Sequence, residues 1–306
     1  MKILFTGGGG AGSEAIYRIL KDFYDVYFAD ADINAINPLI PLKRRHSIPM
    51  ANNPKFLEGV KKICDQLSID LLIPGVDEEL ALLGELDSVN IMLPDADYVN
   101  TMLDKFKSSR VLSGLGLDAP VTTLISDYKN NNWTYFPCIA KPVSGRGSRD
   151  VYIIESAKQI SAYLSLTGIS EYKAVLQEKI VGIEYTVLVA ADSKANLHAV
   201  VPVKIKSKKG ITISAITERN LLVEEACRNI HNLLPTRGCY NIQLILTSDG
   251  KVFPFEINPR ISTTFCMSLV AGVNPIDIYS QKCAPEKLLT YKTGLKLQRY
   301  WTNDFS

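Results

Sequence analysis

The sequence predicts a mixed α/β and α+β protein built from three units, and three observations support this fold class. Strands and helices alternate through residues 1–99, which is typical of a doubly wound parallel sheet. A glycine-rich connection between two short strands indicates a small α+β unit at residues 121–178. An Asp-Gly turn between two β-rich runs indicates an antiparallel sheet within residues 179–306. Residues 100–120 are expected to link the first unit to the second through a helix.

In the first unit, apolar runs and the turn residues beside them define the elements in order. Strands are expected at residues 3–6, 26–29, 70–74 and 90–93, and helices at residues 13–22, 54–67 and 78–86. Apolar residues then recur at helical spacing through residues 100–115, and Gly114 and Gly116 mark the end of this linking helix. Because crossovers between parallel strands are right-handed, this order favours one sheet with helices on both faces.

The later elements are shorter and mixed. Strands are expected at residues 136–141, 151–154, 174–177 and 184–190, and helices at residues 157–166, 222–234 and about 275–283. The runs at residues 240–246 and 251–257 are expected to pair as a hairpin.

Composition limits the classes of function. The formal net charge of +2 over 306 residues gives no electrostatic case for a nucleic-acid or membrane partner. No apolar run approaches the length that spans a bilayer. The chain opens directly on a strand, so we expect no signal peptide and a cytoplasmic location. The six cysteines form no Cys-x-x-Cys pair and are expected to be reduced thiols, and three isolated histidines disfavour a His-based metal site.

The hairpin carries the most informative motif. Asp249-Gly250 predicts a two-residue turn that pairs Ser248 with Lys251. The same register sets Gln243 opposite Glu256. Asn258 lies two residues beyond Glu256, so both side chains face the same side of the sheet.

Three oxygen-bearing side chains therefore converge on one face of this hairpin. Hard cations such as Mg²⁺ take oxygen ligands and keep part of their coordination for water and phosphate. Arg260 follows directly, with a planar guanidinium suited to phosphate. Taken alone, the pattern is also compatible with a solvated polar face.

Gly7, Gly9 and Gly12 match the spacing G-x-G-x-x-G between a strand and a helix, and Asp30 ends the next strand. This combination is typical of dinucleotide sites. Consecutive glycines also suit a tight turn that packs the helix on the sheet, and a substrate site at the helix N-terminus is a third interpretation. The sequence leaves these open.

A second glycine-rich segment follows a strand that ends in Lys141. Gly145, Arg146, Gly147 and Ser148 come directly after it. A strand-end lysine beside such a loop suits a phosphate clamp, since the lysine supplies charge and the loop supplies unobstructed backbone N–H groups. No G-x-x-x-x-G-K-[ST] motif is present, and a mobile surface hairpin is the alternative.

The segment Gln177, Glu178, Lys179 and Ile180 lies where the middle unit meets the last one, with Glu184 six residues beyond Glu178. Carboxylates and exposed backbone at such a junction can bind ribose hydroxyls and a base edge. Two solvated glutamates are the alternative, and Lys105 on the linking helix would by itself be solvated.

Together and in this order, these motifs resemble the ATP-grasp superfamily over essentially the whole chain. The sequence is similar to the ATP-binding halves of the carbamoyl-phosphate synthetase large subunit and to small stand-alone ligases of the pyrrolysine-biosynthesis type. Both the ATP-grasp architecture and a Mg²⁺-ATP cofactor, with Mn²⁺ as a second metal option, are what this resemblance implies.

The resemblance also implies a role for each motif. Lys105 and Lys141 would bind the α- and β-phosphates, and Glu184 the ribose. Adenine would contact Gln177, Glu178, Lys179 and Ile180. The loop formed by Gly145, Arg146, Gly147 and Ser148 would close over the phosphates as a lid. The metal ligands would be Gln243, Glu256 and Asn258, although many family members carry an acid where this chain has Gln243. Arg260 and Lys141 would serve catalysis.

By this resemblance we expect an ADP-forming ligase that activates a small-molecule carboxylate as an acyl phosphate and couples it to an amine. Alternatives are phosphorylation of bicarbonate or carbamate, a non-catalytic ATP-binding module and a nicotinamide-dependent oxidoreductase. Candidate substrate elements are the Gly7–Gly12 loop, residues 77–79, Lys204 and residues 210–219, with Asp77 as a helix cap in the simpler interpretation. Residues 206–209 are expected to form a solvated basic loop. A homodimer is possible, but the sequence does not decide it.

Overall fold

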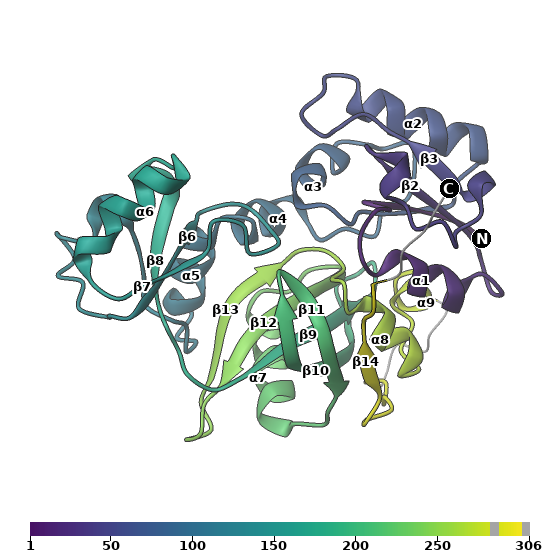
Figure 1. Cartoon of the computed structure of the whole chain (residues 1–306). Helices are drawn as coiled ribbons and strands as arrows, with labels where there is room; N and C mark the ends of the chain where they lie inside the picture. The colour runs from purple at the N-terminus through teal and green to yellow at the C-terminus, as the bar shows by residue number, and fades with distance from the viewer. Residues whose placement is uncertain (282–287, 302–306) are drawn as a thin grey trace.

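A computed structural model of the chain describes residues 1–281 and 288–301. Its described residues form three β-sheets, and in Figure 1 the sheet within residues 122–178 lies at the left, extending away from the other two. The mixed architecture expected from the sequence is present: a parallel N-terminal sheet, a small α+β unit and an antiparallel C-terminal sheet.

The N-terminal sheet has the strand order β3-β2-β1-β4, with all pairs parallel. Its elements are β1 (Lys2–Thr6), α1 (Ser13–Leu20), β2 (Asp25–Asp30), β3 (Arg45–Ser47), α2 (Phe56–Leu67), β4 (Leu71–Ile73) and α3 (Asp77–Leu83). Apolar side chains of β1 are buried on both faces, as a covered parallel sheet requires. The expected strand at residues 90–93 is reduced to a single bridge between Leu72 and Ile91.

The expected linking helix is two helices, α4 (Ala96–Met102) and α5 (Lys105–Gly114). The break occurs at Asp104, whose side chain accepts hydrogen bonds from the backbone N–H groups of Phe106 (3.0 Å) and Lys107 (2.9 Å). An aspartate in this position satisfies two N–H groups that have no partner within the helix, so it starts a new helix. Lys105 therefore lies at a helix N-terminus rather than in mid-helix.

The middle unit is an antiparallel sheet with the order β5-β8-β6-β7. Its strands are β5 (Thr122–Leu124), β6 (Cys138–Pro142), β7 (Tyr152–Ile154) and β8 (Ala174–Glu178), and α6 (Ile160–Thr167) covers one face. It has its own apolar core, which includes Trp133, Ile160 and Leu176. We call this unit the lid sheet.

The C-terminal sheet has six strands in the order β13-β12-β9-β10-β11-β14. They are β9 (Ile183–Ala191), β10 (Leu197–Lys209), β11 (Ile211–Thr217), β12 (Gly238–Leu246), β13 (Val252–Asn258) and β14 (Lys296–Gln298). The helices around it are α7 (Leu221–Leu233), α8 (Phe265–Val270) and α9 (Pro275–Tyr279), and the expected extension of α9 to Cys283 lies outside the described residues. Short 3₁₀ turns are η1 (Ile33–Ala35), η2 (Leu42–Arg44), η3 (Ile125–Asp127), η4 (Ala157–Gln159) and η5 (Glu171–Lys173).

Both faces of the C-terminal sheet are buried. One face packs Tyr185 and Val187 against α7. The other face shares a continuous apolar core with the N-terminal sheet, where Phe5 contacts Phe28 and Phe265. This shared core holds the carboxyl edge of the N-terminal sheet near the end of β13.

The turn of the β12–β13 hairpin differs from the expected one. Thr247, not Ser248, pairs with Lys251, and Gly250 donates to Thr247 O (3.1 Å) at a φ of +85°. This is a three-residue loop with glycine in the left-handed position. A bulge at Phe255 shifts the register back by one residue, so Gln243 does lie opposite Glu256.

Two further observations complete the fold. In the described part of the chain, no helix is both long and apolar enough to cross a membrane. The described cysteines, which exclude Cys283, are buried and free: Cys64, Cys138, Cys227, Cys239 and Cys266.

Candidate active site

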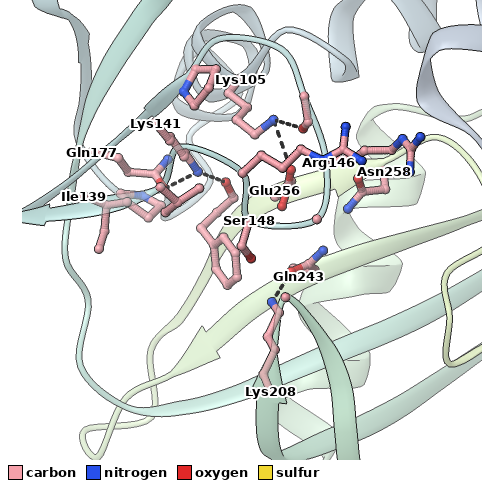
Figure 2. A pocket seen from close by; sticks show the side chains of 18 of the residues that line it. Lys105, Ile139, Lys141, Arg146, Ser148, Gln177, Lys208, Gln243, Glu256 and Asn258 are labelled. Carbon is pink, nitrogen blue, oxygen red and sulfur yellow. Dashed lines mark hydrogen bonds and ion pairs between the residues drawn. The ribbon is translucent and has the colours of Figure 1, made fainter. Parts of the chain in front are cut away.

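A cavity of about 350 Å³ opens between the lid sheet and the β12–β13 hairpin. Every residue expected to bind ATP or metal lines it except Glu184, and the close-up in Figure 2 labels several of them. The lining residues that the sequence predicted are Lys105, Lys141, Gly145, Arg146, Gly147, Ser148, Gln177, Glu178, Lys179, Ile180, Gln243, Glu256, Asn258 and Arg260. Residues more than 150 positions apart in the sequence thus meet in one place.

Lys105 bridges the lid loop and the hairpin. Its Nζ lies 3.2 Å from Glu256 Oε1 and donates to the carbonyl oxygen of Gly145 at 2.8 Å. The start of α5 places it there, since the backbone N–H of Lys105 also bonds Val143 O at the end of the lid strand (2.9 Å). Both ends of this ion pair are shielded, with side chains 10% and 18% exposed.

Lys141 is the most deeply buried cation of the site. Its Nζ donates to Gln177 Oε1 at 2.8 Å and lies 3.5 Å from Phe255 O, as the dashed lines in Figure 2 show. Burial lowers the pKa of Lys141 to about 8, Glu256 opposes this, and Lys105 and Lys208 add to it. An entering anion would therefore find a cation with few partners of opposite charge.

Glu256 keeps its negative charge in spite of burial. Removal from water acts to raise its pKa, but the ammonium groups of Lys105 and Lys141 outweigh this and hold the pKa below its usual value. The site around Glu256 therefore contains more cationic than anionic side chains, an arrangement suited to a polyanion.

The strand β8 forms the hinge side of the cavity. Gln177 is 4% exposed, and its amide donates to Thr122 Oγ1 (3.1 Å) while its carbonyl holds Lys141. Glu178 bonds Val121 through both its backbone N–H (2.8 Å) and its carboxylate (3.2 Å). These side chains fix the hinge itself, which leaves backbone groups and Ile180 to face the cavity.

Apolar residues that the sequence did not single out form the cavity walls. They are Ile139, Ile245 and Phe255. Ile139 precedes Lys141 by two residues on β6, and Ile245 follows Gln243 by two on β12, so strand alternation turns each pair to the same face. The alternation of residues along each strand could therefore have identified Ile139 and Ile245 as wall residues from the sequence.

The glycine loop after β6 covers one side of the cavity. Gly145 and Gly147 have φ of +134° and +68°, which side chains with a Cβ rarely adopt. No heavy atom lies within 4 Å of a Cβ placed on either glycine, so the loop is not packed down. Arg146 reaches across to Glu78 at the start of α3, with an Nε–Oε2 distance of 2.9 Å.

Arg260 forms an ion pair with Asp77, the first residue of α3. Their side chains are 13% and 9% exposed, and Arg260 also donates to Ile261 O (2.9 Å). The capping role considered for Asp77 is wrong, because Val76 occupies the cap position and no side chain caps this helix. Asp77 instead directs the guanidinium to the cavity edge.

Lys208 is a site residue that the sequence analysis missed. The expected basic loop is the end of β10, and Lys208 Nζ lies 2.8 Å from Glu184 Oε1. It also lies 3.1 Å from Gln243 Oε1 (Figure 2). Glu184 is thereby placed beside the cavity although it does not line it. Lys204, a candidate substrate residue, pairs instead with Glu218 (3.3 Å).

The Gly7–Gly12 loop lies outside this cavity. A Cβ on Gly7, Gly8 or Gly9 would come within 2.6–2.9 Å of Val76, Phe28 or Ala35, so packing requires these glycines. Asp30, at the end of β2, accepts a hydrogen bond from Gly9 N (2.8 Å) and ties the loop to that strand. The loop also lines a second, adjoining cavity of about 830 Å³.

The hairpin residues suit a hard divalent cation. Gln243, Glu256 and Asn258 offer one carboxylate and two amide oxygens, the donor type that Mg²⁺ prefers. Glu256 and Gln243 already attract the ammonium groups of Lys105 and Lys208, so cations are favoured at both oxygens. Within residues 1–281 and 288–301, no group of three or more His, Cys, Asp or Glu side chains could hold a metal. The hairpin would thus supply part of a coordination shell, with other oxygens completing it.

The chain also matches known proteins in sequence. A family model described as "ATP-grasp domain" matches residues 102–264. The chain is 26% identical to D-alanine–D-alanine ligase of Aquifex aeolicus (strain VF5) over 196 residues, 59% of this chain and 67% of that protein. It is 21% identical to carbamoyl-phosphate synthase of Methanobrevibacter smithii over 304 residues, 90% of this chain and 78% of that protein.

Solved structures share the fold. An L-amino acid ligase from Bacillus licheniformis aligns with a TM-score of 0.70 at 17% identity, over 92% of this chain and 73% of that one. The biotin carboxylase domain dimer of 2-oxoglutarate carboxylase from Hydrogenobacter thermophilus, in complex with MgADP, ADP and bicarbonate, aligns at 0.69 and 14% identity. That alignment covers 95% of this chain and 72% of the other.

Proposed function

We propose, on the premise that the chain belongs to the ATP-grasp family, that it is a Mg²⁺-dependent ligase that activates a carboxylate with ATP and joins it to an amine. ADP and phosphate would be the other products. The observation that carries the proposal is the cavity that brings Lys105, Lys141, Glu256 and Arg260 together beneath a glycine loop. A module that only binds nucleotide has no need of Arg260 and Glu256 in this arrangement.

The cavity offers a separate place for each part of ATP. Adenine would lie between the apolar walls, Ile139 and Ile245, with its edge toward the backbone of residues 178–180. Glu184, beside the cavity, would accept from the ribose hydroxyls while Lys208 holds its Oε1 at 2.8 Å. Lys105 and Lys141 would bind the phosphates, and N–H groups of the glycine loop would close over them.

Gln243, Glu256 and Asn258 would hold Mg²⁺, with Mn²⁺ as a substitute of similar chemistry. The metal would supply charge neutralisation on the transferring phosphoryl group and orient it. Lys105 would then move from Glu256 toward phosphate, because the metal replaces it as the counter-charge of that carboxylate.

In the proposed reaction a carboxylate oxygen attacks the γ-phosphorus, the bond to the β,γ-bridging oxygen breaks, and ADP leaves. An amine then attacks the acyl carbon, loses a proton, and phosphate leaves with the C–O bond electrons. Lys141 and Arg260 would offset the negative charge that develops on the phosphoryl and acyl oxygens. Closure of the glycine loop would exclude the water that hydrolyses acyl phosphates.

Bicarbonate as the acceptor remains a second candidate, favoured by the likeness to carbamoyl-phosphate synthase over most of the chain. A homodimer is proposed only by analogy with the dimer named for the biotin carboxylase neighbour. A cytoplasmic location likewise stays a proposal.

The test is a phosphate-release screen of Mg-ATP against pooled amino acids, small carboxylates, amines and bicarbonate. We expect release that requires Mg²⁺, a carboxylate and an amine together, and that Glu256→Gln abolishes. Glu155→Gln, an exposed glutamate of the lid sheet, is the matched control. Full turnover in Glu256→Gln would remove the hairpin from the active site, and release with bicarbonate alone would favour the second candidate.

A further inference from the structure

The larger cavity, of about 830 Å³, lies between the carboxyl edge of the N-terminal sheet and the C-terminal sheet. It adjoins the first cavity, because Arg146, Lys208, Gln243, Asn258 and Arg260 line both. Its volume is in the range of small-molecule sites. A molecule here would therefore reach the residues at which phosphoryl transfer is proposed.

The two walls of this cavity carry opposite charge. Asp30 and Glu79 line the wall from the N-terminal sheet, while Lys208 and Arg260 of the C-terminal unit and Arg149 of the lid loop line the opposite side. Arg260 is already paired with Asp77, and Lys208 with Glu184. The acidic wall has no such compensation: among the described residues, no Lys or Arg forms an ion pair with Glu79 or Asp30.

Glu79 is 7% exposed and is held by one hydrogen bond, from Thr6 Oγ1 at 2.5 Å. Asp30 is oriented by backbone N–H groups of Gly9 (2.8 Å) and Asp32 (3.0 Å), one on each carboxylate oxygen. A buried carboxylate without a cation, as at Glu79, is costly, and the half-buried Asp30 lies on the same wall, so a cationic ligand group would stabilise both.

A second observation points to a ligand with N–H groups. Asn241 lines the same cavity, is 1% exposed, and donates through Nδ2 to Arg260 O (3.0 Å). Its Oδ1 is buried and has no hydrogen-bond partner among the described residues. A buried acceptor without a partner favours a ligand that carries a hydrogen-bond donor. Because Asn241 is bonded to the backbone of Arg260, a donor that reaches its Oδ1 would lie beside the proposed site of phosphoryl transfer.

We propose that this cavity binds an amino acid, with its protonated amine held by Glu79 and Asp30 and its carboxylate directed toward Arg260. This inference rests on the proposed function, since it assigns the carboxylate substrate of that reaction. Asn241 Oδ1 accepts from the attacking amine. Burial raises the pKa of Glu79 to about 7. The Thr6 hydrogen bond and Arg146 act to lower this pKa, while Asp30 and Glu78 raise it further. A bound ammonium group would favour the charged form of Glu79.

The test compares acids that differ only in their amines. Mg-ATP-dependent ADP release would be measured with L-alanine against propionate, L-ornithine against pentanoate, and L-lysine against hexanoate, each with a mixture of primary amines. We expect at least one amine-bearing acid to give a kcat/KM tenfold or more above its deaminated counterpart. Glu79→Gln and Asp30→Asn should each raise the KM for that acid at least tenfold and leave the KM for Mg-ATP within twofold.

Glu85→Gln, an exposed glutamate just beyond α3, is the matched control and should leave both KM values unchanged. The Asp30 variant keeps the test decisive should Glu79→Gln fail to fold. Equal use of deaminated acids, no response to any amine-bearing acid, or an unaltered KM in both variants would overturn the inference. If Mg-ATP still binds and a deaminated acid supports turnover, this inference alone fails; if Mg-ATP does not bind, the proposed function fails.

Discussion

Replacing Lys141 by methionine is expected to abolish activity and at the same time to stabilise the unliganded protein at neutral pH. Lys141 is 5% exposed, and burial lowers its pKa from 10.5 to about 8. One pKa unit corresponds to about 1.4 kcal/mol, so holding this ammonium charged at pH 7 costs the folded state about 3 kcal/mol. Methionine has a similar length and no charge to desolvate.

Part of that gain is offset. Without Lys141, Gln177 Oε1 loses its donor at 2.8 Å, and an unsatisfied buried acceptor costs about 1–3 kcal/mol. We therefore expect the free energy of unfolding of Lys141→Met to exceed that of the wild type by roughly 1 kcal/mol at pH 7.

The dependence on pH separates charge from packing. Between pH 8 and 10.5 the unfolded chain binds more protons at Lys141 than the folded chain does, so wild-type stability from this group rises with pH. At pH 9.5 about 2 kcal/mol of the cost is relieved, and the advantage of the variant should reverse. Urea unfolding at pH 7 and pH 9.5 measures this, with the exposed lid residue Lys158→Met as control. A stability difference that is the same at both pH values would refute the reasoning.

Three other expectations follow from the same geometry. Lys208→Met should raise the KM for Mg-ATP about tenfold in steady-state kinetics, because it removes the charged hydrogen bond to Glu184, and such a bond contributes about 1.5–3 kcal/mol. The control Lys209→Met should leave this KM unchanged. Equal KM values in the two variants would show that the contact to Glu184 is incidental. Arg260→Met should lower the free energy of unfolding, measured by urea titration, by about 3–5 kcal/mol because it leaves Asp77 buried and unpaired. The double variant Arg260→Met with Asp77→Leu should recover much of that loss. No recovery in the double variant would contradict the pairing. Because Lys141 must be charged to bind phosphate, kcat/KM for Mg-ATP should fall above about pH 8, and a profile that is flat to pH 9.5 would speak against this role.

The sequence predicted the local parts of the site well where strand alternation and short-range turns decide them. Glu256 and Asn258 share a face because they are two residues apart on one strand. The pairing of Gln243 with Glu256 was predicted through a wrong turn: a three-residue loop shifts the register, and the bulge at Phe255 restores it. Pro254, beside the bulge, fits either an edge strand or a bulge, so the sequence did not locate the bulge.

The misses arise from contacts between distant segments. We interpreted Lys208 as part of a solvated loop because the charged end of β10 lacks the apolar alternation that marks a strand. Pairing with β11 makes this segment a strand. The ion pair of Arg260 with Asp77 spans 183 positions, and only the packing of one sheet on the other creates it. The break before Lys105, by contrast, could have been read from Asp104.

The most direct test of the central claim is a crystal structure with Mg²⁺ and a non-hydrolysable ATP analogue. We expect the phosphates within hydrogen-bonding distance of Lys105 and Lys141, the adenine beside residues 177–180, and a metal bound by Glu256. An analogue bound instead at the Gly7–Gly12 loop, or a metal remote from Glu256, would contradict the account.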